Sequence, residues 1–503
     1  MSNIHIGDGY IINSFNSQLS VIQENLNIPI DNKDSTAVQF GDPSFPYGTR
    51  FRCQADIDRC LDGYSHFKHW MDVLDALAGM TCAYIITLDA SDITDDQWAR
   101  STDTASPFNF SRTIFIDEGH WNITGPSPSN WPVIGSYSNQ SIVSVQTGNS
   151  NPHITTSGTP YTTGALKGYF IRLSTGQIAC IHDNTTSTIY TIQSLSPAPT
   201  VGSTTFDIVR PYQLQNTLNG TTEFLSGSPG VFVWGDGRPH QSSSFNYIEN
   251  LGFNAFGSIS SIHIVNDFGR WEFNYCDFDQ SFNTSGFYHM VLQYGSYILV
   301  QNSVRRGNVS NSVGFHGSTY ANCTLYFYLC YMGGGGVVFG INRGNLICYS
   351  TVVDGGGSFN WPASVIYISP WSHDSTIGSF GSNKTTTIRA KSGYAGLRLR
   401  GCASPSIVGN ISFEKCTQPC ILLEYGANFR EESGGLLDGG GNTDVGISVQ
   451  SNSTLILSNS STNTIAGSSG TIKVDSYTFD TLNNFKAHVP FVDITSGARA
   501  TSE

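Results

Sequence analysis

Two aspartates that lie two residues apart are the strongest candidates for acid–base chemistry in this sequence of 503 residues. Asp277 and Asp279 stand in a segment, 271–279, whose aromatic and apolar residues predict a β-strand. Side chains two residues apart share one face of a strand and lie about 6 to 7 Å apart. Hydrolysis of a glycosidic bond uses two carboxyl groups roughly 5 to 9.5 Å apart. The pair fits a catalytic site, although a solvated strand face that carries aspartates by chance is the commoner explanation.

The element that must position these aspartates is a repeating coil. From about Val291 onward, short apolar strands alternate with corners rich in Gly and Asn, and most units begin roughly 22 to 28 residues apart. A unit of this length contains two or three short strands and cannot bury its apolar face alone, so it must stack on its neighbours. The spacing predicts an all-β fold, a right-handed parallel β-helix, with its main solenoid over residues 212–475.

Alternation along the strands assigns side chains to the two faces of each coil. Alternation predicts that the following side chains point inward: Cys276, Phe278, Ile298, Val300, Leu325, Phe327, Leu346 and Cys348. The same alternation points a set of aromatic side chains outward, where stacked coils would align them: Trp271, Phe273, Tyr275, Tyr297, Tyr326, Tyr328, Tyr349 and Tyr367. Such a stripe is suited to stacking on sugar rings or to burial in a trimer interface, and the interface is the favoured hypothesis.

Lyase chemistry is a weaker alternative. It would need an arginine base beside an acidic, calcium-binding cluster, and Arg305 and Arg306 lie about one coil from the two aspartates. The eleven cysteines show no spacing typical of a zinc site and are expected to be buried, reduced thiols. We therefore predict neither a metal nor a cofactor.

The regions that flank the solenoid have other patterns. Residues 1–60 lack the repeat and are predicted to form an arm that attaches to a larger particle. Residues 61–154 contain an amphipathic pattern over 65–79, predicted to be a helix that caps the first coils. Residues 155–211 predict a small inserted subdomain of antiparallel strands. Residues 476–503 lose the repeat and are predicted to cover the last coil or to form a tail.

Composition excludes several kinds of partner. Charged residues make up 13% of the chain, and 38 acidic against 25 basic side chains give a net charge of −13. An acidic chain without a long basic cluster is unsuited to following a phosphate backbone, so no nucleic-acid partner is expected. The sequence has no run of membrane-spanning length. Its first residues do not have the pattern of a secretory signal, so synthesis in the cytoplasm is expected.

Several segments together resemble a known family. The amphipathic segment 67–77, the strand 84–90, the stretch 114–126 and the end of the insertion at 206–211 are similar to the pectate-lyase-like β-helix proteins of bacteriophage virions, such as tailspikes and tail fibres. The resemblance is one of layout and covers about residues 65–475. It implies a homotrimer that is attached to a virion, points at the host surface and in some members cleaves polysaccharide.

Three functional hypotheses remain open. The first is a virion appendage that attaches to other tail, baseplate or capsid proteins through its arm and presents an adhesive surface to host glycans. The second is a polysaccharide depolymerase, a hydrolase or a lyase, on the same scaffold. The third is a decoration protein that binds no host molecule. A groove with converging carboxylates would favour the second hypothesis over the first.

Overall fold

The computed structural model describes residues 120–148 and 151–216 continuously, four short strands before them and, between residues 230 and 501, the strands with some of the residues that connect them. The predicted capping helix over 65–79 lies outside the described residues. So does the predicted arm, apart from the first strand, and so does much of the C-terminal segment after residue 475.

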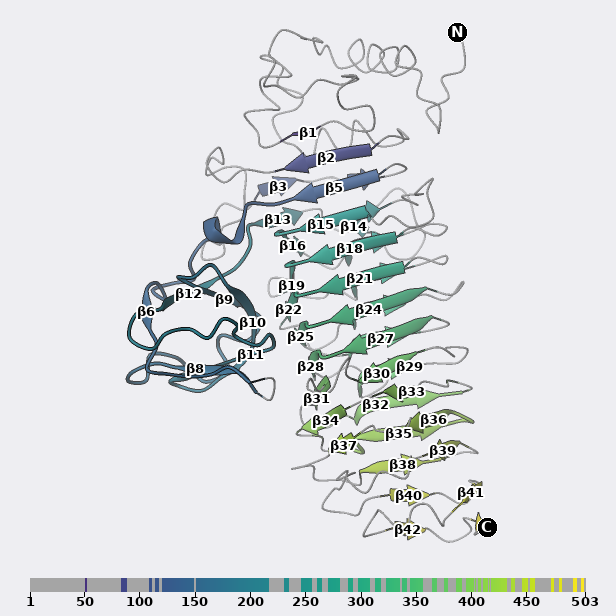
Figure 1. Ribbon diagram of the computed structural model, residues 1–503. Helices are drawn as coiled ribbons and strands as arrows, with labels where there is room; N and C mark the ends of the chain where they lie inside the picture. Colours follow the sequence, from purple (N-terminus) through teal and green to yellow (C-terminus); the bar gives the residue numbers. More distant parts are fainter. Residues whose placement is uncertain are drawn as a thin grey trace, which may run out of the picture.

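Three parallel sheets make up the described part of the β-helix, and Figure 1 shows their strands stacked one above another from the N-terminal to the C-terminal end. Sheet A has twelve strands among the described residues: β1 (Arg50–Phe51), β2 (Ala83–Thr87), β5 (His120–Thr124), β15 (Asn246–Glu249), β18 (Arg270–Asn274), β21 (Tyr297–Gln301), β24 (Thr324–Tyr328), β27 (Asn345–Tyr349), β30 (Thr376–Gly378), β33 (Ser406–Val408), β36 (Asn428–Glu431) and β39 (Thr454–Ile456). Every neighbouring pair in it is parallel, as between β18 and β21.

In the part of the chain that the structure describes, sheet B has ten strands: β3 (Phe108–Phe110), β13 (Gln213–Asn216), β16 (Gly252–Ala255), β19 (Asp277–Gln280), β22 (Val304–Gly307), β25 (Tyr331–Gly334), β28 (Val352–Gly355), β31 (Thr386–Ala390), β34 (Asn410–Glu414) and β37 (Leu436–Asp438). Sheet C has twelve described strands: β4 (Ile114–Ile116), β14 (Gly230–Trp234), β17 (Ser260–Ile264), β20 (Tyr288–Leu292), β23 (Val313–Gly317), β26 (Val337–Ile341), β29 (Ser364–Ile368), β32 (Ala395–Arg400), β35 (Ile421–Glu424), β38 (Ile447–Val449), β40 (Ile472–Val474) and β42 (Val492–Ile494).

From β3 to β39, the described chain outside the insertion visits sheets A, B and C in turn, so each of these coils contributes one strand to each sheet. Strand β18 of sheet A leads into β19 of sheet B and β20 of sheet C before the chain returns to sheet A at β21. The predicted parallel β-helix is therefore confirmed. Sheet C continues to β42, so parallel pairing extends beyond residue 475, where the sequence predicted the repeat to end. Strands β41 (Phe479–Thr481) and β43 (Arg499–Thr501) pair with each other.

The interior of the β-helix is a stack of apolar side chains in register. Ile298 and Val300 lie directly over Leu325 and Phe327, which in turn lie over Leu346 and Cys348. All six are fully buried, as alternation predicted. Burying each such side chain stabilises the fold by roughly 1.5 to 3 kcal/mol, so the in-register stack is the main source of stability.

The outward assignment of Trp271 and Phe273 is wrong. Both are fully buried and stack in register with Ile298 and Val300 inside the helix. The prediction extended the alternation from Cys276 back into β18, across the corner between β18 and β19. Tyr275 at that corner has a φ of +51°, in the left-handed region, and this turn interrupts the alternation. Parity in one sheet therefore gives no information about the next.

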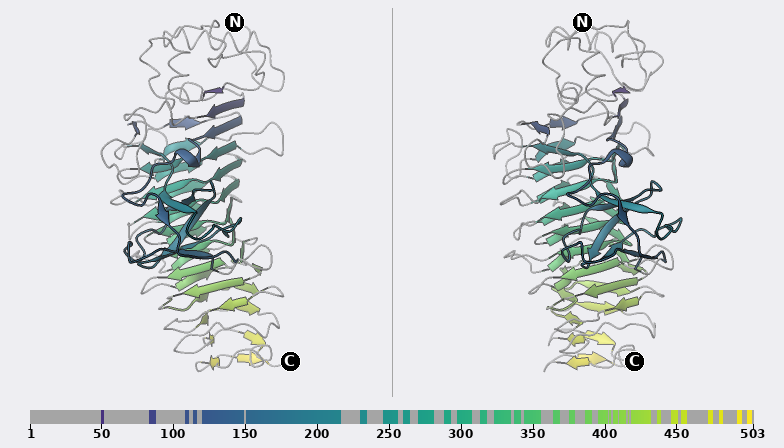
Figure 2. Two further views of the ribbon diagram at one scale, coloured as in Figure 1. Left: turned by 60° about the vertical axis from the view of Figure 1, so that its left-hand side comes forward. Right: turned by 90° about the vertical axis from the view of Figure 1, so that its left-hand side faces the viewer.

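A seven-stranded antiparallel sheet forms the inserted subdomain, which lies against one side of the β-helix in Figures 1 and 2. After a short 3-10 turn, η3 (Pro128–Asn130), its strands are β6 (Gln140–Ser141), β7 (Ser144–Gln146), β8 (His153–Thr155), β9 (Phe170–Leu173), β10 (Ile178–Asn184), β11 (Thr188–Thr191) and β12 (Thr205–Val209). The predicted insertion is present and begins earlier than residue 155, because β6 and β7 are too short and polar to give a strand signal.

The insertion packs on the outer face of sheet B. Its residues Trp131, Phe170 and Cys180 bury an apolar surface together with residues of sheet B, Val304, Tyr331 and Val352. Figure 2 shows the inserted strands lying across the middle of the solenoid. The outer face of sheet B, which alternation alone would assign to solvent, is therefore an interior surface at this height.

Candidate functional site

One corner of the β-helix carries a column of residues in the left-handed conformation. Asn250, Tyr275, Asn302, Leu329 and Ser350 each follow the last residue of a sheet A strand and have φ values between 48° and 60°. Asparagine adopts this conformation more readily than most residues. The column ends each strand of sheet A at the same level, so the outward side chains of successive strands line up.

Four of the predicted tyrosines come together on the outer face of sheet A. Tyr297, Tyr326, Tyr328 and Tyr349 are all half-buried and come from the neighbouring strands β21, β24 and β27. The rings of Tyr326 and Tyr349 meet edge to face, with centroids 5.8 Å apart. Burial raises the pKa of Tyr326, and the other three hydroxyls add to the shift. The structure thus groups these rings as alternation predicted.

Tyr367 does not belong to this group. It lies on β29 in sheet C, is 5% exposed and packs against Val337. Trp271 is excluded as well, because it lies inside the helix. Tyr275 is half-exposed but sits at the corner beneath the insertion rather than on the sheet A face. The predicted eight-ring stripe is therefore a four-ring cluster with Tyr275 at one side.

Two glutamates continue this face toward the N-terminal end. Glu249 on β15 accepts a hydrogen bond from the hydroxyl of Tyr247, and Glu272 on β18 accepts one from the amide of Gln301. The amide of Asn274 donates to the Tyr247 hydroxyl at 2.9 Å and to Glu249 at 3.4 Å. All of these side chains are half-buried. We call the set of Tyr247, Glu249, Glu272, Asn274 and Gln301 the glutamate cluster.

The two glutamates of this cluster have different environments. Burial raises the pKa of Glu272, and the charge of Glu249 adds to the shift, while the bond from Gln301 opposes it. Tyr247 lies opposite Glu272 in the parallel ladder, and Glu249 lies two residues further along β15. The Cβ atoms of the glutamates are therefore diagonal neighbours, about 8 Å apart from the strand spacing and rise.

The aspartates predicted as a catalytic pair lie elsewhere, under the insertion. Asp277 and Asp279 do share the outer face of β19, but they are 0% and 1% exposed, so this strand face is not solvated. Arg210, at the end of the insertion, contacts Asp277 at 3.0 Å and Asp279 at 2.8 Å. Arg306 on β22 contacts the same carboxylates at 2.7 and 3.1 Å. We call these four residues the charge clasp.

The charge clasp fits a structural role better than catalysis. Burial raises the pKa of Asp277, and the two guanidinium groups oppose this shift. Because the insertion covers both carboxylates, a polymer on the outside cannot reach them. Arg305, the other arginine considered for lyase chemistry, is fully buried and stacks in register with Phe278 and Met332 inside the helix. The catalytic role of Asp277 and Asp279 stays a prediction, and the glutamate cluster is the more accessible carboxylate pair.

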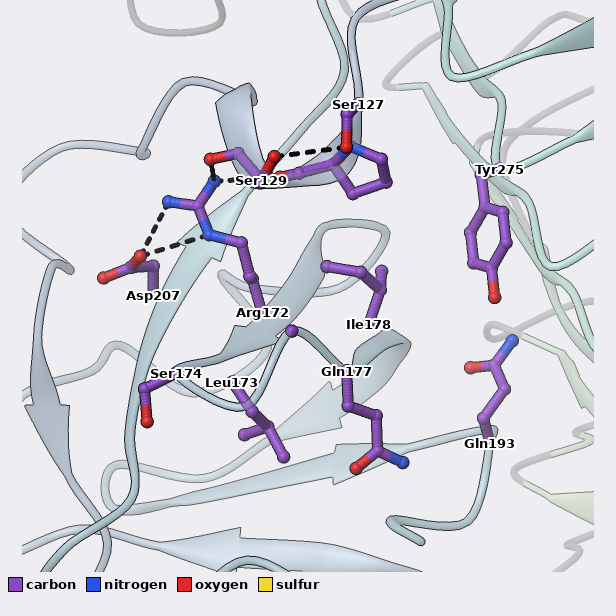
Figure 3. Close-up of a pocket in the computed structure, with 12 residues that line it drawn as sticks. Ser127, Ser129, Arg172, Leu173, Ser174, Gln177, Ile178, Gln193, Asp207 and Tyr275 are labelled. Atoms are coloured by element: carbon purple, nitrogen blue, oxygen red, sulfur yellow. Dashed lines mark hydrogen bonds and ion pairs between the residues drawn. The ribbon is translucent and has the colours of Figure 1, made fainter. Parts of the chain in front are cut away.

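A cavity of about 730 Å³ opens where the insertion meets the corner of sheet A. Figure 3 shows Tyr275 on the β-helix side, opposite Ile178 and above Gln193 of the insertion. The amide of Gln193 donates to Asn302 at 3.3 Å, and Asn302 donates to Asn274 at 3.1 Å. A hydrogen-bonded path therefore joins the wall of the cavity to the glutamate cluster.

Sequence reasoning missed Glu249, Tyr247 and the cavity. Tyr247 and Glu249 alternate with the buried Ile248, as Glu272 and Asn274 alternate with Phe273, so an alignment of coils in register could have found the cluster. The cavity leaves no such signal, because it depends on how the insertion docks.

Within the described part of the chain, no helix is long and apolar enough to cross a membrane. The same residues contain no group of three or more His, Cys, Asp and Glu side chains arranged to bind a metal ion. The seven cysteines that the structure describes are buried, and none of them forms a disulfide bond.

Comparisons with known proteins add one likeness. No protein-family model matches the chain, and a search of curated proteins finds no match. Among solved structures, the tailspike protein gp49 from Pseudomonas phage LKA1 aligns with 78% of this chain and 73% of its own, at 11% identity and a TM-score of 0.19. At that identity and TM-score the alignment carries no argument about function. The chain is similar to a phage tailspike, and its own strand pairing shows it to be a parallel β-helix protein.

Proposed function

We propose that this protein is a structural appendage of a bacteriophage virion and that the outer face of sheet A between β15 and β27 binds glycans on the host surface. The observation that carries the proposal is the position of four half-exposed tyrosines beside a hydrogen-bonded set of carboxylate and amide groups. Aromatic faces cover the apolar C–H surfaces of sugar rings, and amides and carboxylates bind their hydroxyls.

The glutamate cluster argues against the alternative that this face is the core of a trimer interface. Glu249 and Glu272 are half-buried and accept hydrogen bonds from Tyr247 and Gln301. Burying such carboxylates against another subunit would cost several kcal/mol for each ion without a compensating charge. The homotrimer implied by the resemblance remains part of the proposal, with its interface elsewhere on the solenoid, and the arm over 1–60 is proposed to attach it to other virion proteins.

The test replaces Tyr326 and Tyr328 together by alanine. We expect binding of the purified protein to host cells to fall at least tenfold, because two stacking surfaces are lost. The matched control is Tyr425→Asn, which removes a ring that is 57% exposed at a corner with a φ of 55°, where Asn is tolerated. Unchanged binding in the double variant, or an equal loss in the control, would refute the assignment of the site.

Polysaccharide hydrolysis is the second candidate, and the two glutamates are the observation that favours it. Their Cβ atoms lie about 8 Å apart on one face of sheet A, close enough for the two carboxyl groups to act on one glycosidic bond. The raised pKa of Glu272 suits a general acid, and Glu249 would act as the base. Glu272→Gln should then abolish the release of reducing ends from host polysaccharide. Undetectable release by the unmodified protein would eliminate this candidate and leave the adhesive one.

A further inference from the structure

The cavity between the insertion and the corner of sheet A has the dimensions and chemistry of a second ligand site. Its volume of about 730 Å³ lies within the range of small-molecule pockets in proteins, roughly 300 to 1,000 Å³. All of its lining residues belong to the insertion except Tyr275, which the β-helix supplies. The docked β-helix therefore supplies one side of the cavity, through Tyr275.

The rim of the cavity is rigid and electrically neutral. Arg172 donates to the carbonyls of Pro128 and Ser129 at 2.8 and 2.7 Å, which fixes the turn at the rim. The same guanidinium pairs with Asp207 at 2.7 Å, as Figure 3 shows. The arginine is thus occupied by a carboxylate and by backbone carbonyls, and it offers no free positive charge to an anionic ligand.

The floor is equally fixed. The side-chain carbonyl of Gln193 accepts from the backbone N–H of Cys180 at 2.7 Å, and its amide nitrogen donates to the carbonyl of Leu329 at 3.0 Å. Gln177, also in the wall, has a buried Oε1 atom without a hydrogen-bond partner among the described residues.

Tyr275 supplies an aromatic surface at a conformational cost. Its φ of +51° is a conformation in which non-glycine residues are strained, and asparagine takes the equivalent corner at Asn250 and Asn302. The half-exposed ring faces the cavity, and its hydroxyl makes no hydrogen bond to any described residue. The hydroxyl points toward Gln193 in Figure 3, so it lies where a bound molecule would meet it.

We infer that this cavity binds an uncharged, hydroxyl-rich sugar residue, held against Tyr275 and adjacent to the glycan that we propose for the sheet A face. The inference rests on that proposed function for the identity of the ligand as a glycan. The neutral rim offers nothing to a carboxylate or phosphate, and Glu249 lies on the path of hydrogen bonds that leads out of the cavity, where it repels anions. One chain of sugars crossing Asn274 and Asn302 would reach both sites.

The test measures binding of the full chain to a panel of immobilised oligosaccharides that are neutral, N-acetylated, uronic or sialylated. We expect the uncharged members to bind best. Tyr275→Asn removes the ring while keeping a residue that the corner tolerates, and should weaken this binding at least tenfold with an unchanged melting temperature. Tyr275→Phe removes only the hydroxyl and should weaken it about 3- to 10-fold. Ser129→Trp, at the exposed rim, should block the cavity independently.

The outcomes separate this inference from the proposed function. If the Tyr326→Ala, Tyr328→Ala double variant loses binding while Tyr275→Asn and Ser129→Trp bind as the parent does, the cavity is not a sugar site and the sheet A face still is. If none of these variants changes binding, or if no member of the panel binds, the glycan-binding function fails and this inference fails with it. A preference for uronic or sialylated members would overturn the assignment of an uncharged ligand.

Discussion

The charge clasp gives the sharpest prediction, because its four members are buried and their contacts are known. Replacing Arg210 by Met removes one of the two guanidinium groups and keeps most of the side-chain volume. Asp277 and Asp279 keep their contacts with Arg306, and the net charge of the charge clasp changes from neutral to −1. Methionine also fills the space without placing a new polar group there.

The expected loss follows from burial. Arg210 is 3% exposed, and the carboxylates that it contacts are 0% and 1% exposed. Removing one partner of a buried ion pair costs about 3 to 5 kcal/mol, because the remaining charge stays out of water. Arg306 still contacts both carboxylates, so the lower end applies, about 3 kcal/mol. The cost should appear as weaker docking of the insertion, since Arg210 is its connection to β19.

Hydrogen exchange of the native protein measures this directly. Amides of β9 and β12 should exchange about 100-fold faster in Arg210→Met, since every 1.4 kcal/mol changes an opening equilibrium tenfold. Adding Asp279→Asn restores neutrality, so the double variant should exchange more slowly than Arg210→Met alone. Exchange in Arg210→Met within threefold of the parent would refute the reasoning, as would a double variant that loses the sum of the two single effects.

Three further predictions concern the same interface and the core. His182 is buried beside Arg389, and burial together with the charges of Arg389 and Lys167 lowers its pKa from 6.5 to about 3. Its pKa is lower in the folded than in the unfolded protein, so its contribution to the free energy of unfolding is fully present above pH 6.5 and is lost as the pH falls toward 3. The loss at pH 5, measured in thermal melts, should be about 2 kcal/mol. His182→Gln should remove that difference, and an identical pH dependence in this variant would contradict the assignment. Gly168→Ala would place a Cβ atom 2.3 Å from Cγ of Arg306, whereas Gly158 has a similar φ and open space around it. Gly168→Ala should therefore lower the melting temperature clearly more than Gly158→Ala. Equal shifts in melting temperature would show that the close approach to Arg306 does not affect stability. Trp271→Ala should lower the free energy of unfolding, measured with denaturant, by about 3 to 5 kcal/mol because it leaves a cavity in the core. A decrease below about 1 kcal/mol would contradict the buried position of Trp271.

The sequence alone determined the fold class because the information is local and repeated. A strand of five residues such as Tyr297–Gln301 shows by its own alternation that Ile298 and Val300 point inward, and the next coil repeats the pattern. Within one strand, successive side chains point to opposite faces because of the backbone geometry alone. The same rule failed for Trp271, because it was applied across a corner where Tyr275 adopts a left-handed conformation.

The candidate site required the tertiary structure. Alternation within β19 placed Asp277 and Asp279 together on an outer face, but only the docked insertion shows that this face is dry and holds Arg210 and Arg306. The glutamate cluster depends on the register between β15 and β18, and the cavity beside Tyr275 depends on a contact between segments more than 100 residues apart, such as Gln193 and Asn302. Local residue patterns therefore determined which faces turn inward and outward. Which outward faces remain in contact with water was decided by long-range docking, because solvent exposure is a property of the assembled surface and not of any one strand.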